Sequence, residues 1–236
     1  MRHCMAPGRI LLMVMTAVLL ASCTTLPSIT LPDQASLPDT VHRCGRPFLH
    51  VPYRFVHAIE FTVPGGGMGT VVGVTMFDPA SEVIRSAIMT IEGFVLFDAR
   101  YEEGVRVNRA VPPFDKEQFA NYMMEDIRLM FLAPRGRLAH AGLLADGSSV
   151  CRYEGEGMVV DVIVHEDDAW EIATYAGGQK PLRKVRASSV RDGIPEMLEL
   201  SAFGFREYSL RLKLISAEAV SPDALRPSHG ESPEDE

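Results

Sequence analysis

Phe55–Val63 reads Phe-Val-His-Ala-Ile-Glu-Phe-Thr-Val, an alternation that sets the architecture of the whole chain. Its odd-numbered positions hold mostly large apolar side chains, and its even-numbered positions include Glu60 and Thr62. Because successive side chains of a strand point to opposite faces, this repeat predicts a strand with one apolar face. Pro64–Gly67 follows as a turn and Thr70–Phe77 as a second apolar run, so we expect an antiparallel hairpin.

The same pattern continues through most of the chain. Short apolar segments are separated by glycine, proline or acidic turn residues, which is typical of strands in an antiparallel sheet. The further predicted strands are Val83–Ile91, Phe94–Tyr101, Val105–Ala110, Leu138–Leu144, Ser149–Tyr153, Met158–His165, Trp170–Tyr175, Leu182–Ser188, Met197–Phe203 and Tyr208–Ile215. The last is the clearest, because leucines alternate there with Ser209, Arg211 and Lys213.

One long segment instead has the repeat of a helix. Its apolar residues lie three or four positions apart, as on one face of an α-helix, and they are Phe119, Met123, Ile127, Met130 and Phe131. Asp115 and Gln118 have the spacing of a capping box and Pro134 ends the segment, so we predict a helix over Lys116–Leu132. The charged residues expected mostly on its solvent side are Glu117, Glu125, Asp126 and Arg128.

Many short strands, one long helix and no crossover helices predict an α+β fold. We expect a large antiparallel sheet that curls into an incomplete barrel, with the helix packed against it. Some strands, such as Met158–Val164, are apolar on both faces, so one face must meet packed side chains or a cavity. The candidate lining residues of such a cavity are Phe94, Leu96, Phe119, Met123, Ile127, Val160 and Val162.

The N-terminus predicts export. Arg2 and Arg9 precede an apolar run over Ile10–Leu20, which is typical of a secretory signal peptide and too short for a permanent membrane span. The following Leu-Ala-Ser-Cys resembles the lipobox of bacterial lipoproteins. This resemblance implies cleavage before Cys23 and acyl chains, palmitate among them, on that cysteine. Thr24, rather than an aspartate, follows it and favours an outer-membrane anchor that faces the periplasm.

The sequence divides into four parts. Residues 1–22 are the predicted signal peptide, and residues 23–41 are a lipidated tether in which three prolines oppose regular structure. Residues 42–220 are the predicted folded domain. Residues 221–236 are acidic and lack an apolar repeat, so we expect a disordered tail.

Charge and cysteine content narrow the function further. The formal charge is −8, and without the two arginines of the signal peptide it is −8 − 2 = −10, which disfavours nucleic acid as a partner. Cys44 and Cys151 remain once Cys4 is cleaved off and Cys23 is lipidated, and they form either a disulfide or two buried free thiols. Neither has a second ligand at a zinc-like spacing, so no metal site is predicted.

Catalytic signatures are not found. The sequence has no Gly-x-Ser-x-Gly elbow and no His-Glu-x-x-His helix, so we predict a protein that is not an enzyme and has no cofactor. His57, on an apolar strand face, is interpreted as an interior histidine. A basic strand is either a solvated face or a surface for anionic lipid headgroups or an acidic partner, and its candidate residues are Arg183, Lys184 and Arg186.

Three later segments look like the terminal half of the lipoprotein receptor LolB: Ala169–Tyr175, Ile194–Leu200 and Tyr208–Ile215. The order of a strand meander, a helix and these strands is similar to the LolA/LolB family, an incomplete antiparallel barrel plugged by helices around a hydrophobic cavity. The resemblance implies binding or transfer of a lipid or acylated molecule. The alternative is a structural or assembly subunit of a cell-envelope complex. Met68 could be an apolar loop tip as in LolB, although the glycines before it favour a plain hairpin with a buried methionine.

Overall fold

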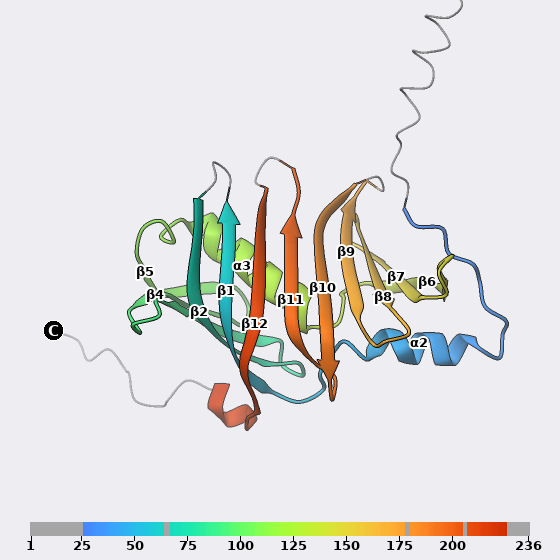
Figure 1. Ribbon diagram of the computed structural model, residues 1–236, viewed down its shortest axis with the longest axis horizontal. Helices are drawn as coiled ribbons and strands as arrows, with labels where there is room; N and C mark the ends of the chain where they lie inside the picture. The colour runs from blue at the N-terminus through green and yellow to red at the C-terminus, as the bar shows by residue number, and fades with distance from the viewer. Residues whose placement is uncertain (1–25, 64–66, 178–179, 205–206, 226–236) are drawn as a thin grey trace, which may run out of the picture.

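The computed structural model describes residues 26–63, 67–177, 180–204 and 207–225. The predicted signal peptide and Cys23 lie outside these ranges, as do the acidic residues beyond 225. The described chain forms one antiparallel sheet of 12 strands in the order β5-β4-β3-β2-β1-β12-β11-β10-β9-β8-β7-β6 (Figure 1). The edge strands β5 and β6 do not pair with each other, so the barrel is incomplete, as the sequence predicts.

All the predicted strands are confirmed, with small shifts at their ends. They are β1 (Tyr53–Val63), β2 (Gly67–Asp78), β3 (Val83–Met89), β4 (Val95–Tyr101), β5 (Val105–Ala110), β6 (Arg137–Leu143), β7 (Ser149–Gly155), β8 (Met158–Val164), β9 (Trp170–Ala176), β10 (Pro181–Arg191), β11 (Ile194–Ala202) and β12 (Tyr208–Ala219). The described helices are α2 (Leu37–Gly45), α3 (Glu117–Phe131) and the short 3-10 helix η1 (Pro222–Leu225). Met68 at the start of β2 is 80% exposed, so the expectation of a buried methionine is wrong. The start of β2 extends past the end of β3, which pairs with it only from Val72 onward.

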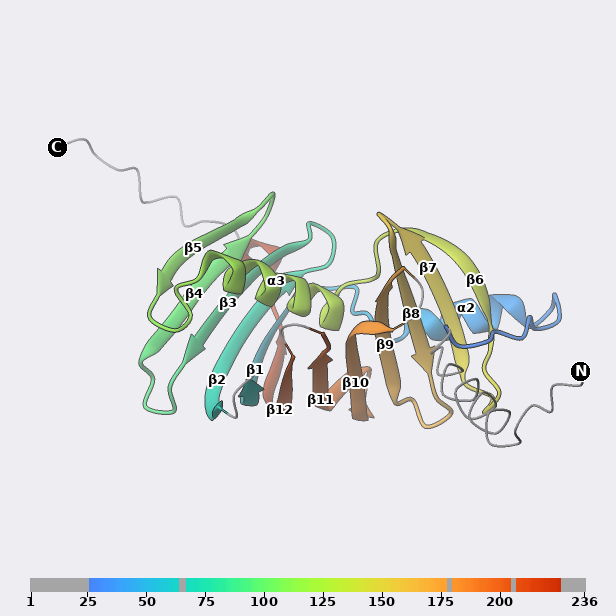
Figure 2. The same ribbon diagram turned by 90° about the horizontal axis from the view of Figure 1, so that it is seen from above.

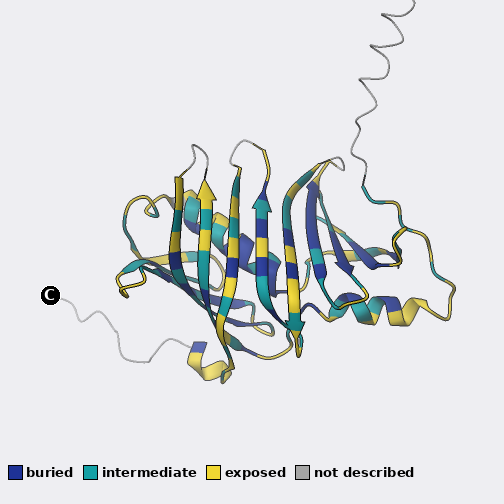
Figure 3. Cartoon of the chain, viewed as in Figure 1, coloured by how far each residue is buried: buried dark blue, intermediate teal, exposed yellow. Residues whose placement is uncertain are grey.

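The sheet curls around α3, which lies along its inner side (Figure 2). Aromatic contacts identify this side: Phe97 of β4 meets Phe119 of α3 with ring centroids 5.3 Å apart, and Phe55 of β1 stacks on Phe131 at 5.1 Å. We call the face that carries Phe55 and Phe97 the concave face, and the opposite one the convex face. Along the first half of β12, exposed residues alternate with buried or half-buried ones, and Figure 3 shows them as bands of colour.

The predicted long helix is confirmed as α3, but two details differ. Its N-cap residue is Lys116, without a side-chain cap hydrogen bond, so capping by Asp115 is wrong. The buried residues of the helix include Met124 in place of the expected Met123. Asp126, expected toward solvent, is only 4% exposed, because the curled sheet covers more of the helix than a single apolar stripe.

The N-terminal boundary also differs from the prediction. Thr30 pairs with Leu143 of β6 through two backbone hydrogen bonds of 2.9 Å, and α2 begins at Leu37, within the expected tether over 23–41. Pro38 does not prevent the helix, because the first N–H groups of a helix lack internal partners and proline is tolerated there. We call residues 26–36 the strap. A second helix and a strap therefore stand where the sequence predicts only a free tether.

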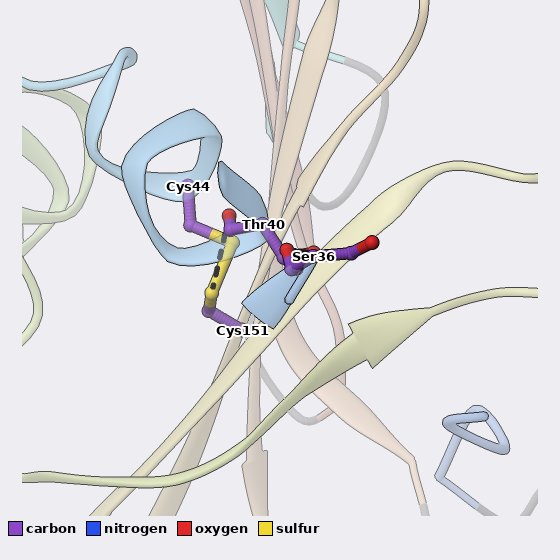
Figure 4. Close-up of a disulfide and its surroundings, with 4 residues drawn as sticks. All are labelled: Ser36, Thr40, Cys44 and Cys151. Carbon is purple, nitrogen blue, oxygen red and sulfur yellow. Dashed lines mark hydrogen bonds between the residues drawn. A yellow bond between two sulfur atoms is a disulfide. The ribbon is translucent and has the colours of Figure 1, made fainter. Parts of the chain in front are cut away.

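Cys44 and Cys151 form a disulfide that joins α2 to β7, with Cα atoms 6.0 Å apart (Figure 4). Both cysteines are fully buried. The backbone carbonyl of Thr40, one helical turn earlier, lies 3.9 Å from Cys151 Sγ, and the Thr40 hydroxyl donates to the Ser36 carbonyl at 3.1 Å. Of the two alternatives for these cysteines, the disulfide is therefore correct.

The C-terminal boundary is later than predicted. The expected disordered tail starts at residue 221, but Pro222–Leu225 form η1, which contacts β2 and β3. Leu225 is buried, and removing its apolar side chain from water favours packing of this short segment. The acidic residues around Leu225 make this packing hard to predict from composition.

Candidate functional site

Three rows of side chains cross the concave face from β7 to β12, because the strand register places one residue of each strand beside the next. The row nearest the start of β10, which we call the upper row, is Tyr153, Val160, Thr174, Arg183, Ala202 and Tyr208. The middle row is Cys151, Val162, Ile172, Val185, Leu200 and Leu210. The lower row is Ser149, Val164, Trp170, Ala187, Leu198 and Leu212. The concave face thus has an apolar middle and a more polar upper row.

Two side chains of β9 on the concave face each carry a polar atom that has no partner in the described part of the chain. Trp170 Nε1 and Thr174 Oγ1 are buried, and neither has a hydrogen-bond partner among the described residues. Trp170 is 3% exposed and Thr174 is 8% exposed, and the fully buried Ile172 lies between them on the same face. A buried polar group left without a hydrogen bond costs about 1–3 kcal/mol. Each of these two atoms would therefore gain stability from a hydrogen-bond acceptor or donor that reached it.

A charged cluster fixes α3 to the upper row. Arg183 Nε donates to Asp126 Oδ1 at 2.6 Å, and the Tyr208 hydroxyl donates to Asp126 Oδ2. The Arg183 guanidinium also lies 5.6 Å from the centroid of the Tyr122 ring. Burial raises the pKa of Asp126 to about 6, and the opposing effects of Arg183 and Tyr208 are smaller. The cluster holds the middle of α3 against β10 and β12.

His57 lies near the C-terminal end of α3. It is buried, and its ring centroid is 6.1 Å from that of Phe131 and 5.6 Å from that of Phe55. Burial lowers the pKa of His57 to about 4, so the ring is neutral at neutral pH. The interpretation of His57 as an interior histidine is confirmed.

Six of the seven predicted cavity-lining residues lie in or against one packed hydrophobic core. Ile127 of α3 and Val162 of β8 are buried in the packed core. Those that are half-buried against this core are Leu96, Phe119, Met123 and Val160. Phe94 is 55% exposed, and the Arg109 guanidinium lies 5.1 Å from its ring centroid. The residues of β4 and β8 belong to this core although the two strands lie in opposite halves of the sheet.

The basic residues of β10 do not form one surface. Because they alternate along a strand, Arg183 faces the concave side and Lys184 and Arg186 face the convex side. Lys184 and Arg186 both pair with Glu171, at 2.7 and 2.8 Å. All three basic residues have an ion-pair partner within the chain, and only Lys184 and Arg186 share a face of the sheet.

Sequence reasoning missed a buried ion pair on the convex face of β7 and β8. Arg152 Nε and Nη2 donate to the two oxygens of Asp161 at 2.7 and 2.8 Å, and Nη2 also donates to the Pro27 carbonyl of the strap at 3.0 Å. Asp161 is fully buried. Its position inside the apolar run Met158–Val164 was a usable signal, because a buried carboxylate requires a partner.

Neither a metal-binding cluster nor a candidate membrane-spanning helix occurs in the part of the chain that the structure describes. No group of three His, Cys, Asp or Glu side chains there is placed to hold a metal ion. No helix there is both long enough and apolar enough to cross a membrane.

The elements above define an open antiparallel sheet wrapped around one helix, with a second helix at its far end. No model of a known protein family matches the sequence, and no curated protein matches it. A solved LolA-superfamily protein from Nitrosomonas europaea superposes with a TM-score of 0.55 at 12% sequence identity, covering 80% of this chain and 96% of that chain. The fold of this protein is therefore LolA-like, as its sequence predicts.

Two further solved structures have lower scores. A domain described as an outer membrane lipoprotein-sorting protein from Vibrio parahaemolyticus gives a TM-score of 0.47 at 9% identity, covering 80% of this chain and 95% of that chain. A DUF1329 family protein from Desulfovibrio piger gives 0.48 at 13% identity, covering 84% of this chain and 100% of that chain.

Proposed function

We propose that this protein is a lipoprotein, anchored to the outer membrane through Cys23 and facing the periplasm, that binds or transfers a lipid or another acylated molecule on its concave face without catalysing a reaction. The observation that carries the proposal is the pair of polar atoms Trp170 Nε1 and Thr174 Oγ1, which flank the apolar middle row of the concave face and have no partner among the described residues. Ligand sites are typically apolar with a few placed polar groups. An acyl ester matches both properties, because its chains are apolar and its carbonyl oxygens accept hydrogen bonds.

The fold and the N-terminus support the proposal. The LolA/LolB fold surrounds a hydrophobic cavity, and this chain has a LolA-like fold. The strap limits the reach of the anchor, because Arg152 holds Pro27 against β7. At about 3.5 Å per residue, the chain between Cys23 and Pro27 spans at most about 14 Å. The domain would therefore act next to the membrane that holds Cys23.

The protein carries its own reporter for binding, because Trp170 is the single tryptophan of the chain. We expect a delipidated full chain to show quenched Trp170 fluorescence when titrated with a phospholipid whose acyl chains are brominated. The same phospholipid without bromine should leave the quantum yield nearly unchanged. Mass spectrometry of the lipid extract of freshly purified protein would identify the natural ligand.

A matched control moves the reporter to the other side of the sheet. Lys213 of β12 is exposed on the convex face, so Trp170→Phe combined with Lys213→Trp should not be quenched by the brominated lipid. Equal quenching at both positions, or no quenching at Trp170, would contradict binding on the concave face.

Anchoring is tested separately. Cys23→Ser is expected to release the protein from the membrane fraction into the soluble one. If this variant still fractionates with the outer membrane, the lipid anchor is not what holds the protein there.

A further inference from the structure

Three arginines stand directly opposite one another on the convex face of β3, β4 and β5. Arg85 is in register with Arg100, and Arg100 is in register with Arg106. Phe97 of β4 faces α3, so Arg100, three positions later on the same strand, faces the other way. We call these residues the arginine row. It is not evident in the sequence, because the three positions are brought together only by strand pairing.

The arginine row has too few carboxylates to balance it. Arg100 pairs with the largely exposed Glu102 at 2.7 Å, whereas Arg85 and Arg106 have no ion pair or hydrogen bond from their side chains within the described residues. The Nε atoms of Arg85 and Arg100 are buried without a partner there. Asp98, the next convex residue of β4, instead accepts a hydrogen bond from Asn108 at 3.1 Å. Three guanidiniums thus share one carboxylate.

Another row of charged residues on the convex face is balanced in charge. Across β9, β10, β11, β12 and β1 the register aligns a ladder of alternating charge, and its members are Glu171, Arg186, Glu199, Arg211 and Glu60. Its ion pairs include Arg186 with Glu171 at 2.8 Å and Arg211 with Glu199 at 3.1 Å. Like charges directly opposite across strands are destabilising. The arginine row therefore departs from the pattern of its own face at a cost in stability.

We propose that the arginine row is a binding site for a phosphate group. Guanidinium groups present paired N–H donors that match phosphate oxygens, and buried Nε–H groups that lack an acceptor would gain one. The protein as a whole is acidic, with a formal charge of −8, so its long-range field repels anions. Recognition must then come from close hydrogen bonds at the row itself. The site is on the opposite side of the sheet from the concave face and does not depend on lipid binding there.

The test measures thermal unfolding and titration calorimetry of the full chain with inorganic phosphate, against chloride at the same ionic strength to account for screening. Phosphate is expected to raise the midpoint of unfolding, because it binds only the folded state. Arg85→Gln and Arg106→Gln should each weaken phosphate binding about tenfold, as expected for the loss of a charged hydrogen bond. Without phosphate these variants should unfold at an equal or higher temperature, since they remove like-charge repulsion.

The matched control is Arg211→Gln, which removes an arginine of the same face from the balanced ladder and should leave phosphate binding unchanged. Vesicles of an anionic phospholipid, compared with zwitterionic ones, distinguish a lipid headgroup from free phosphate as the source of the group. Equal loss of binding in Arg211→Gln, or no effect of either probe on the wild type, would overturn the proposal. Binding that begins only after Glu231, Glu234, Asp235 and Glu236 are replaced by amides would also overturn it, by assigning the row to the chain's own carboxylates.

Discussion

The two ends of the sheet are held to their helices by different means. α3 has 15 residues and buries a long apolar face, with Phe131 stacked on Phe55 and Phe77. α2 has only 9 residues, of which two are buried, and a disulfide ties it to β7. Short helices are marginal in water, and most helix stability in proteins comes from packing. A helix with a large buried face therefore needs no covalent bond, whereas a short helix with little to bury does.

Removing the disulfide tests whether α2 is held covalently, and it is expected to have the largest effect on stability. The bond closes a loop over a sequence separation of 107, which in the chain-entropy model contributes about 4–5 kcal/mol. Replacing Cys44 and Cys151 together by alanine should lower the free energy of unfolding by that amount, measured by equilibrium urea denaturation. Reduction of the wild type should cause the same loss. A loss below about 1 kcal/mol in either would show that α2 is held by packing after all.

For α3, Phe131→Ala should lower the free energy of unfolding by about 3–4 kcal/mol, because it leaves a cavity among the aromatic rings of the core. The same denaturation measurement applies. Phe203→Ala provides a control of equal chemistry at a 40% exposed site and should cost much less. If the two variants are equally destabilised, the aromatic stack is not what holds α3 against β1 and β2.

In the half of the molecule that contains α3, two buried groups, His57 and Asp126, make stability depend on pH. The pKa of His57 falls from 6.5 to about 4 on folding, so its contribution to stability is lost as pH falls through this window. The pKa of Asp126 rises from 3.8 to about 6, so its contribution is lost as pH rises through nearly the same window. Each pKa shift changes the free energy of unfolding by up to about 3 kcal/mol, at about 1.36 kcal/mol per pKa unit.

Because the two effects oppose each other, the wild type should be nearly insensitive to pH between about 4 and 6 with respect to these groups. Asp126→Asn leaves the His57 effect alone, so its free energy of unfolding should rise with pH. His57→Phe leaves the Asp126 effect alone, so its free energy of unfolding should fall with pH. Denaturant midpoints across this range measure both slopes. Parallel slopes in the two variants would contradict the assignment.

Local pattern was enough to predict the strands and the long helix, because one buried face imposes a repeat on each. It was not enough for α2 and the strap, since their order depends on partners distant in sequence, such as Leu143 for Thr30. The burial of Asp126 has the same origin, because its partner Arg183 is on β10. Alternation predicts which residues of β9 lie on the concave face. That Trp170 Nε1 and Thr174 Oγ1 lack a partner among the described residues is seen only once neighbouring elements are in place.

The N-terminal attachments also determine how the fold carries a mechanical load. A pull on the chain before residue 27 first meets the Arg152 bond to the Pro27 carbonyl, then the paired hydrogen bonds between Thr30 and Leu143. If these give way, unravelling from that end stops at Cys44, whose covalent bond passes the tension to β7. Force from that direction is thus borne by the β6–β7 end of the sheet, and α3 with its charged cluster is shielded from it.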